Sequence, residues 1–225
     1  MGDTAEIAVM KAMQQNRLHF VGHFADLNDH EDNRRYVKHD PDFFSGRPII
    51  GGKLDYILFN PDAGGLGIEI KNTREWIYPD KAIVTELLRK CLQIDVVPVL
   101  VARRIHYTTF SVLNACGAIV HQFYNQRYPN AEAALAAEVR DKNKLGYFDV
   151  RIGNEPDERL LRFFGSSIPL VAEESREKFD ERKELIDEYV SGPMNYAEFE
   201  RTLREGGDNE GEEEGPDWDP DKDLL

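Results

Sequence analysis

The segment from residue 53 to residue 72 limits most strongly what this chain can fold into, because it consists of two short apolar runs joined by a turn. The residues between the runs, Asn-Pro-Asp-Ala-Gly-Gly, are typical of a turn, so we expect the runs to pair as a hairpin. Side chains alternate between the faces of a strand, which places Glu69 and Lys71 on one face and the apolar side chains of their run on the other. The hairpin register then decides whether Asp55, in the first run, meets Glu69 or Lys71 or leaves that face.

Two carboxylates and an ammonium group that meet in this way suit metal-assisted hydrolysis of a phosphodiester. Carboxylate oxygens are the usual ligands of a hard divalent cation such as Mg²⁺ or Mn²⁺. A cation held in this way polarises a phosphate and lowers the pKa of a bound water, while a neighbouring lysine orients that water or stabilises the developing charge. Asp55, Glu69 and Lys71 are therefore the candidate catalytic residues.

Asp55, thirteen intervening residues and then Glu69-Ile70-Lys71 resemble the signature of the PD-(D/E)xK nuclease superfamily, which includes the Holliday-junction resolvases. The resemblance implies the restriction-endonuclease-like fold, bound Mg²⁺ or Mn²⁺, and cleavage of DNA, or else RNA, by an endonuclease or exonuclease. It implies that Lys71 assists the attacking water, and it allows a homodimer that cuts both strands. The residues that the resemblance assigns to the metal are Asp55, Glu69, the main-chain carbonyl of Ile70, and Glu6 on a first helix.

A second aspartate competes with Asp55 for the first position of the motif. Pro41-Asp42 spells the first half of the motif literally, whereas Leu54 precedes Asp55. We prefer Asp55 because it lies in a strand-like run and Asp42 lies in a polar, aromatic segment that is expected to be a loop. The alternative to a site of either kind is an edge hairpin whose charged face simply meets water.

The order of the remaining elements predicts an α/β fold. A helix is expected from Thr4, as its cap, to Asn16, and a second from Asp80 to Ile94. The apolar run at residues 96–102 indicates a buried strand parallel to that of Glu69, because a helix crosses over between them. We therefore expect a central mixed β-sheet flanked by helices, the restriction-endonuclease-like core, with a helical C-terminal extension.

The charge distribution divides the chain into a nearly neutral part and an acidic end. The formal net charge is −14, but residues 1–172 hold 22 acidic and 21 basic residues, while residues 205–225 hold ten and one. We interpret residues 1–172 as a nuclease-like domain, residues 173–204 as a helical extension, and residues 205–225 as a disordered acidic tail. The tail is a candidate contact for a protein partner or a mimic of nucleic acid.

A modest basic excess follows the motif and suggests where nucleic acid binds. Residues 71–104 contain seven basic and four acidic residues. Trp76 and Tyr78 lie in this stretch, and their rings could stack on exposed bases. The residues expected to contact phosphates are Arg74, Lys81, Arg103 and Arg104.

The remaining features favour a cytoplasmic protein with no membrane segment. No apolar run has the length of a transmembrane helix, and Cys91 and Cys116 lack the spacing of a metal site, so both are expected to be buried thiols. The leading hypothesis is thus a metal-dependent nuclease. The alternatives are a catalytically inactive nucleic-acid-binding or scaffold subunit of a defence, repair or mobile-element complex, and an unrelated enzyme with a structural Glu69–Lys71 pair.

Overall fold

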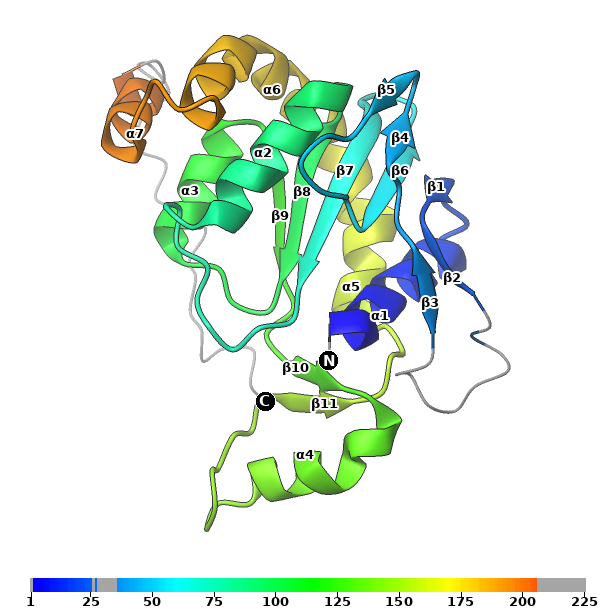
Figure 1. Ribbon diagram of the computed structural model, residues 1–225. Helices are drawn as coiled ribbons and strands as arrows, with labels where there is room; N and C mark the ends of the chain where they lie inside the picture. Colours follow the sequence, from blue (N-terminus) through cyan, green and yellow to red (C-terminus); the bar gives the residue numbers. More distant parts are fainter. Residues whose placement is uncertain (1, 26, 28–35, 206–225) are drawn as a thin grey trace.

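A mixed β-sheet of five strands forms the centre of the molecule, as the sequence predicts. The computed structural model describes residues 2–25, 27 and 36–205 (Figure 1). The strand order is β1-β6-β7-β8-β9, with antiparallel pairs on the β1 side of β7 and parallel pairs from β7 to β9. The strands are β1 (Phe20–Val21), β6 (Tyr56–Asn60), β7 (Gly64–Lys71), β8 (Val97–Ala102) and β9 (Ile119–Gln122).

Helices cover both faces of this sheet and bury a separate apolar core on each. The first core joins α1 (Gly2–Gln15), α5 (Glu158–Arg162) and the π-helical turn η3 (Phe163–Ser167) to one face. The second joins α2 (Ala82–Ile94), α3 (Tyr107–Ala115) and α7 (Tyr196–Glu205) to the other. The alternation predicted for β7 is confirmed, because Leu66, Ile68 and Ile70 all belong to the first core.

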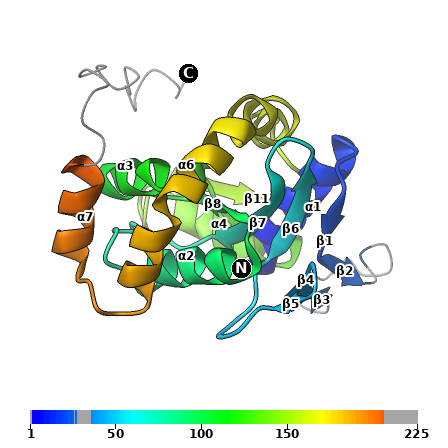
Figure 2. The ribbon, with the colours of Figure 1, turned by 90° about the horizontal axis from the view of Figure 1, so that it is seen from above.

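The long helix α6 (Ile168–Val190) contributes to both cores, so the expected helical extension is part of the domain packing. Ile168, at its start, packs in the first core, whereas Phe179 and Ile186 pack in the second. Viewed from above, α6 runs from the α1 side of the sheet to the α2 side and leads to α7 (Figure 2). The boundary expected between residues 172 and 173 lies inside this continuous helix.

Two local expectations are corrected. Helix α1 begins at Gly2, so Thr4 is buried inside the helix and is not its cap. The stretch expected to be a loop before the hairpin contains short strands instead. These are β3 (Val37–His39), which pairs with β2 (His23–Ala25), and β4 (Phe43–Phe44), which pairs with β5 (Arg47–Pro48).

A small unit follows β9 and packs below the carboxyl ends of β7 and β8 (Figure 1). It consists of the parallel pair β10 (Gln126–Tyr128) and β11 (Val150–Ile152), with the turn η2 (Asn130–Glu132) and α4 (Ala133–Arg140) between them. The side chain of Asn72 fastens this unit to the end of β7, because it donates to the Arg127 carbonyl (2.7 Å) and accepts from the Arg127 amide (2.9 Å).

Other findings bear on the sequence predictions outside the sheet. Cys91 and Cys116 are free, buried thiols, as expected. Within residues 2–25, 27 and 36–205, no helix has the length and apolar character needed to span a membrane. The predicted acidic tail, apart from Glu205 at the end of α7, lies outside the described residues.

The packing of α6 on the sheet can be tested at Gly117, which lies in the α3–β9 connection with φ +76°. A Cβ at this position would lie 2.4 Å from the Phe179 amide nitrogen and from the Ser175 carbonyl oxygen of α6. We expect Gly117→Ala to lower the free energy of unfolding by about 3 kcal/mol or more, measured by urea denaturation.

Gly64→Ala is the matched control, because Gly64 has φ +74° and open space around its Cβ position. The free energy of unfolding of Gly64→Ala should fall by only about 1 kcal/mol, which is the cost of placing alanine in the left-handed backbone conformation. Equal losses in the two variants would contradict the close approach of α6.

Candidate active site

The register of the β6–β7 hairpin brings Asp55 across from Glu69. Tyr56 pairs with Ile68, and the Asp55 amide donates to the Ile68 carbonyl at 2.9 Å. Continuing this register by one residue sets Asp55 opposite Glu69. The hairpin expected from the sequence is therefore present in the register that brings the two carboxylates together.

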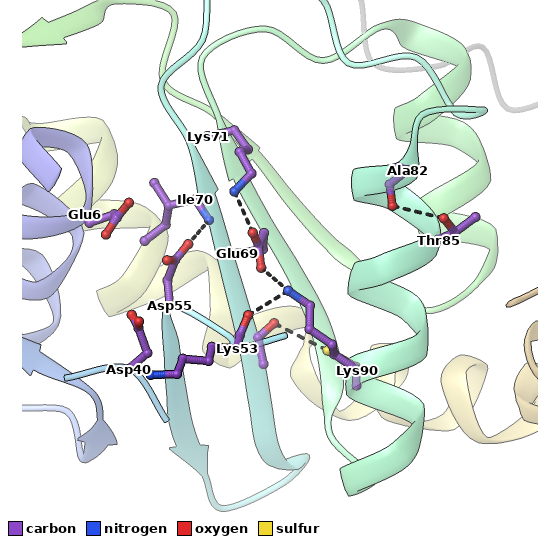
Figure 3. A network of polar contacts seen from close by, with 12 residues as sticks. Glu6, Asp40, Lys53, Asp55, Glu69, Ile70, Lys71, Ala82, Thr85 and Lys90 are labelled. Carbon is purple, nitrogen blue, oxygen red and sulfur yellow. Dashed lines mark hydrogen bonds and ion pairs between the residues drawn. The ribbon is translucent and has the colours of Figure 1, made fainter. Parts of the chain in front are cut away.

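Asp55 itself departs from the regular strand alternation. Its neighbours Leu54 and Tyr56 pack in cores on opposite faces of the sheet. The Asp55 carboxylate lies between them and accepts a hydrogen bond from the Ile70 amide (2.6 Å). Figure 3 shows it between Glu6, which comes from α1, and Glu69 on β7.

Two lysines hold the Glu69 carboxylate, and only one of them was expected. Lys71 Nζ lies 2.6 Å from Oε1, as its place two residues along the strand allows, and Lys90 Nζ lies 2.6 Å from Oε2. Lys90 is buried on α2 and also donates to the Lys53 carbonyl (2.7 Å). Lys90 lies three residues after Leu87 and four before Ile94, which is the spacing of the buried helix face, and this spacing is the sequence signal that could have identified it.

A third lysine, Lys38 on β3, holds the other carboxylates. Its Nζ lies 2.5 Å from Glu6 and 2.8 Å from Asp40, and it also forms an ion pair with Asp55. Lys38 was not expected at the site, because it lies in the segment interpreted as a loop. Glu6 and Asp55 therefore do lie together, with a cation between them.

Burial and mutual repulsion change the pKa values of these groups. The pKa of Glu6 is raised to about 7, first by burial and then by repulsion from the Asp55 carboxylate, while Lys38 opposes the shift. The pKa of Asp55 is also raised, first by burial and then by Glu69. Burial would lower the pKa of Lys71, but the Glu69 carboxylate reverses this effect and raises it. Four acidic side chains and three lysines thus form one electrostatic cluster.

The remaining expected residues divide into three groups. The rival Asp42 is exposed and has no side-chain contact with this cluster among the described residues. Arg74 and Arg104 are partly exposed beyond the ends of β7 and β8, respectively, and Lys81 is exposed before α2. Arg103 is fully buried, so the expectation that it contacts a phosphate is corrected; its Nη1 donates to the Arg74 carbonyl instead (3.2 Å).

The chemistry of the cluster fits a hard divalent cation, although its side chains are paired with lysines. Among the described residues, no group of three or more His, Cys, Asp or Glu side chains is arranged to hold a metal ion. The carboxylates of Glu6, Asp40 and Asp55 nevertheless converge on one cation, the Lys38 ammonium group, and all of their donors are oxygens. A carboxylate arrangement that accommodates an ammonium ion is suited to a metal ion once the lysine withdraws.

Comparison of the chain with protein-family models, with curated proteins and with solved structures finds no match.

The raised pKa of Glu6 predicts a pH dependence of stability. The folded protein binds a proton at Glu6 up to about pH 7, whereas the unfolded chain releases it near 4.5, so stability falls as the pH rises through this window. Glu6→Gln removes the effect. In metal-free urea denaturation we expect the variant to match the wild type at pH 5 and to exceed it by about 2 kcal/mol at pH 8.

The control is Glu75→Gln, because Glu75 is exposed outside the cluster. Its stability should follow that of the wild type at both pH values. A constant difference between Glu6→Gln and the wild type from pH 5 to pH 8 would contradict the shifted pKa.

Proposed function

We propose that this chain is a metal-dependent nuclease that hydrolyses phosphodiester bonds of DNA, with RNA as the less favoured substrate. The observation that carries the proposal is the meeting of Asp55 and Glu69 across the β6–β7 hairpin with Lys71 on the same strand. Because the comparisons find no match, the support comes from this geometry and from the spacing of the motif.

In this proposal the oxygens of the cluster hold Mg²⁺ or Mn²⁺. Asp55, Glu69 and the Ile70 carbonyl would be its ligands, with Glu6 as a further one. When bound, the cation supplies a polarised phosphate and a water of lowered pKa. The Ile70 amide keeps the Asp55 carboxylate in place, and the β6–β7 pairing keeps Glu69 across from Asp55.

Lys71 is the group proposed to act on the substrate. Its side chain is 34% exposed, whereas that of Lys90 is 7% exposed, so Lys71 is the lysine of Glu69 that a phosphate can reach. Its raised pKa keeps the ammonium group protonated at neutral pH. It can donate to a phosphate oxygen as negative charge develops there, while Lys90 keeps Glu69 oriented from the buried side.

The same lysine pairs favour a second candidate function. If Lys38 and Lys90 neutralise the carboxylates permanently, the cluster is an internal ion network, and the chain is a catalytically inactive nucleic-acid-binding or scaffold subunit. The two candidates differ in whether a divalent cation can displace a lysine.

Cleavage assays test the leading proposal. The protein is incubated with end-labelled single-stranded, duplex and branched DNA, and with RNA, in Mg²⁺ or Mn²⁺ and separately in EDTA. We expect metal-dependent cutting that falls by at least about 100-fold in Asp55→Asn and in Lys71→Met, because each removes a group from the reaction centre.

Asp42→Asn is the matched control for Asp55→Asn, because it makes the same chemical change at the exposed rival aspartate. It should cut as the wild type does. Loss of cutting in Asp42→Asn with full activity in Asp55→Asn would transfer the motif to Asp42, and absence of any cutting by the wild type would favour the second candidate.

Metal binding tests the role of Lys38 separately. Lys38→Met removes the ammonium group that three carboxylates share, so the site becomes more negative and gives up no contact to bind a cation. We expect its affinity for Mn²⁺, measured by calorimetry or by electron paramagnetic resonance, to rise about tenfold or more.

Lys81→Met, a change of the same kind at an exposed lysine, should leave the affinity as it is. Weaker binding in Lys38→Met than in the wild type would show that Lys38 supports the site and does not compete with the cation.

A further inference from the structure

Cations and aromatic rings gather where β7 and β8 end, next to the candidate active site. The loops that follow these strands run side by side, because the Arg103 amide donates to the Lys71 carbonyl (2.9 Å) and the Ile77 amide donates to the Arg104 carbonyl (3.1 Å). The β10–β11 unit closes the other side (Figure 1). This end of the sheet is therefore a composite surface built from three segments that are distant in sequence.

Three arginines share one carboxylate at this surface. Asp149, from the segment before β11, lies 3.0 Å from Arg74 Nη2 and 3.2 Å from Arg104 Nη2, and it also forms an ion pair with the buried Arg103. Residues 72–81 and 103–106 together hold four basic and two acidic residues, so with Asp149 the formal charge is +1. This excess is opposite in sign to the charge of the whole chain, and it attracts an anion.

Aromatic rings hold two of these guanidinium groups in position. The Arg74 guanidinium lies 3.7 Å from the centre of the Tyr147 ring, and Arg104 lies 5.3 Å from that of Trp76. The Arg74 side chain is further held by Gln126, whose Oε1 accepts from Nη1 at 3.1 Å. The cations are thus held in position before any ligand arrives, which reduces the entropy lost on binding.

The rings continue away from the arginines along the beginning of α3. His106 packs between Trp76, with ring centres 6.4 Å apart, and Tyr78, at 4.7 Å. Tyr78 is 43% exposed and Tyr107, the next residue after His106, is 73% exposed. Large exposed rings beside fixed cations are the features by which proteins bind unpaired nucleotides.

We propose that this end of the sheet binds single-stranded nucleic acid. The binding surface, which we call the arginine–aromatic surface, consists of Arg74, Trp76, Tyr78, Arg104 and Tyr107. Its place beside the scissile bond rests on the proposed nuclease function, but its binding of single strands does not. A duplex keeps its bases stacked on each other and offers only their edges, so exposed rings gain nothing from it. A single strand presents both a phosphate for each arginine and a free base for each ring.

The distance between this surface and Lys71 suits one continuous strand. Arg74 is three residues beyond Lys71, and three extended residues span at most about 10 Å. When a phosphate of a single nucleic-acid strand lies at Lys71, the neighbouring nucleotides of that nucleic-acid strand therefore lie at the arginine–aromatic surface. The substrate class that follows is a single strand, or a single-stranded segment next to a branch.

Fluorescence of Trp76 provides the test. The chain has two tryptophans, Trp76 and Trp218, so the full-length Trp218→Phe protein reports on Trp76 alone. It is titrated with a thymidine oligonucleotide and with a duplex of equal length, in EDTA so that nothing is cut. We expect saturable quenching by the single strand and affinity for it at least tenfold above that for the duplex.

Variants in this background locate the contacts. Tyr78→Ala and Tyr107→Ala should each weaken binding of the single strand by roughly 5- to 100-fold through lost stacking. Arg104→Gln should weaken it and reduce the slope of log affinity against log salt by about 0.7, the value for one phosphate contact with a single strand. Phe43→Ala, which removes a ring that is 57% exposed on β4, is the control and should bind as the parent does.

The outcomes separate this inference from the nuclease proposal. Equal affinity for duplex and single strand, or unchanged binding in Tyr78→Ala, Tyr107→Ala and Arg104→Gln, overturns the arginine–aromatic surface even if the protein cuts DNA. Binding that follows the expected pattern supports the surface even if no cutting is found, in which case only the nuclease proposal fails. Far-UV circular dichroism of each variant identifies a loss of binding that comes from unfolding.

Discussion

The hydrogen bond from the Ile70 amide to the Asp55 carboxylate is the interaction on which the candidate site depends. It holds the side chain at the boundary between the two faces of the sheet, where Asp55 meets Glu6 from one side and Glu69 from the other. The register of the hairpin makes this bond possible, and the two apolar cores fix the register. A slip of one residue would move the apolar side chains of β7 from the first core to the opposite face of the sheet and separate the carboxylates.

Buried carboxylates require cations, and the chain supplies three lysines from three different elements. Glu6, Asp40, Asp55 and Glu69 face Lys38, Lys71 and Lys90, which leaves the cluster with a formal charge of −1. The cluster is thus neutralised enough to fold without metal and is still negative enough to favour a divalent cation. At the adjacent end of the sheet the balance is reversed, so that carboxylates suited to a metal lie beside arginines suited to a phosphate.

Local sequence patterns predicted the α/β class, the hairpin and the face shared by Glu69 and Lys71, because strand periodicity and turn chemistry act over a few residues. They did not predict that Lys38 and Lys90 are partners of the carboxylates. Lys38 lies in a polar segment with no clear period, and Lys90 reaches Glu69 only through the packing of α2 on the sheet. The burial of Arg103 and the continuity of α6 across residue 172 likewise depend on tertiary contacts. The divalent cation and the hydrolysis of phosphodiesters are inferred from the types of residue at the site and from the convergence of Asp55, Glu69 and Lys71.

Crystals of the protein soaked in Mn²⁺ and measured near the manganese absorption edge would test the central claim most directly. We expect an anomalous peak between the carboxylates of Asp55 and Glu69, with the Ile70 carbonyl as a ligand at about 2.0–2.3 Å and Lys38 moved away from Asp55. Full soaking with no peak at this position, and with Lys38, Lys71 and Lys90 still paired to their carboxylates, would contradict the proposed metal centre and leave the cluster as a structural ion network.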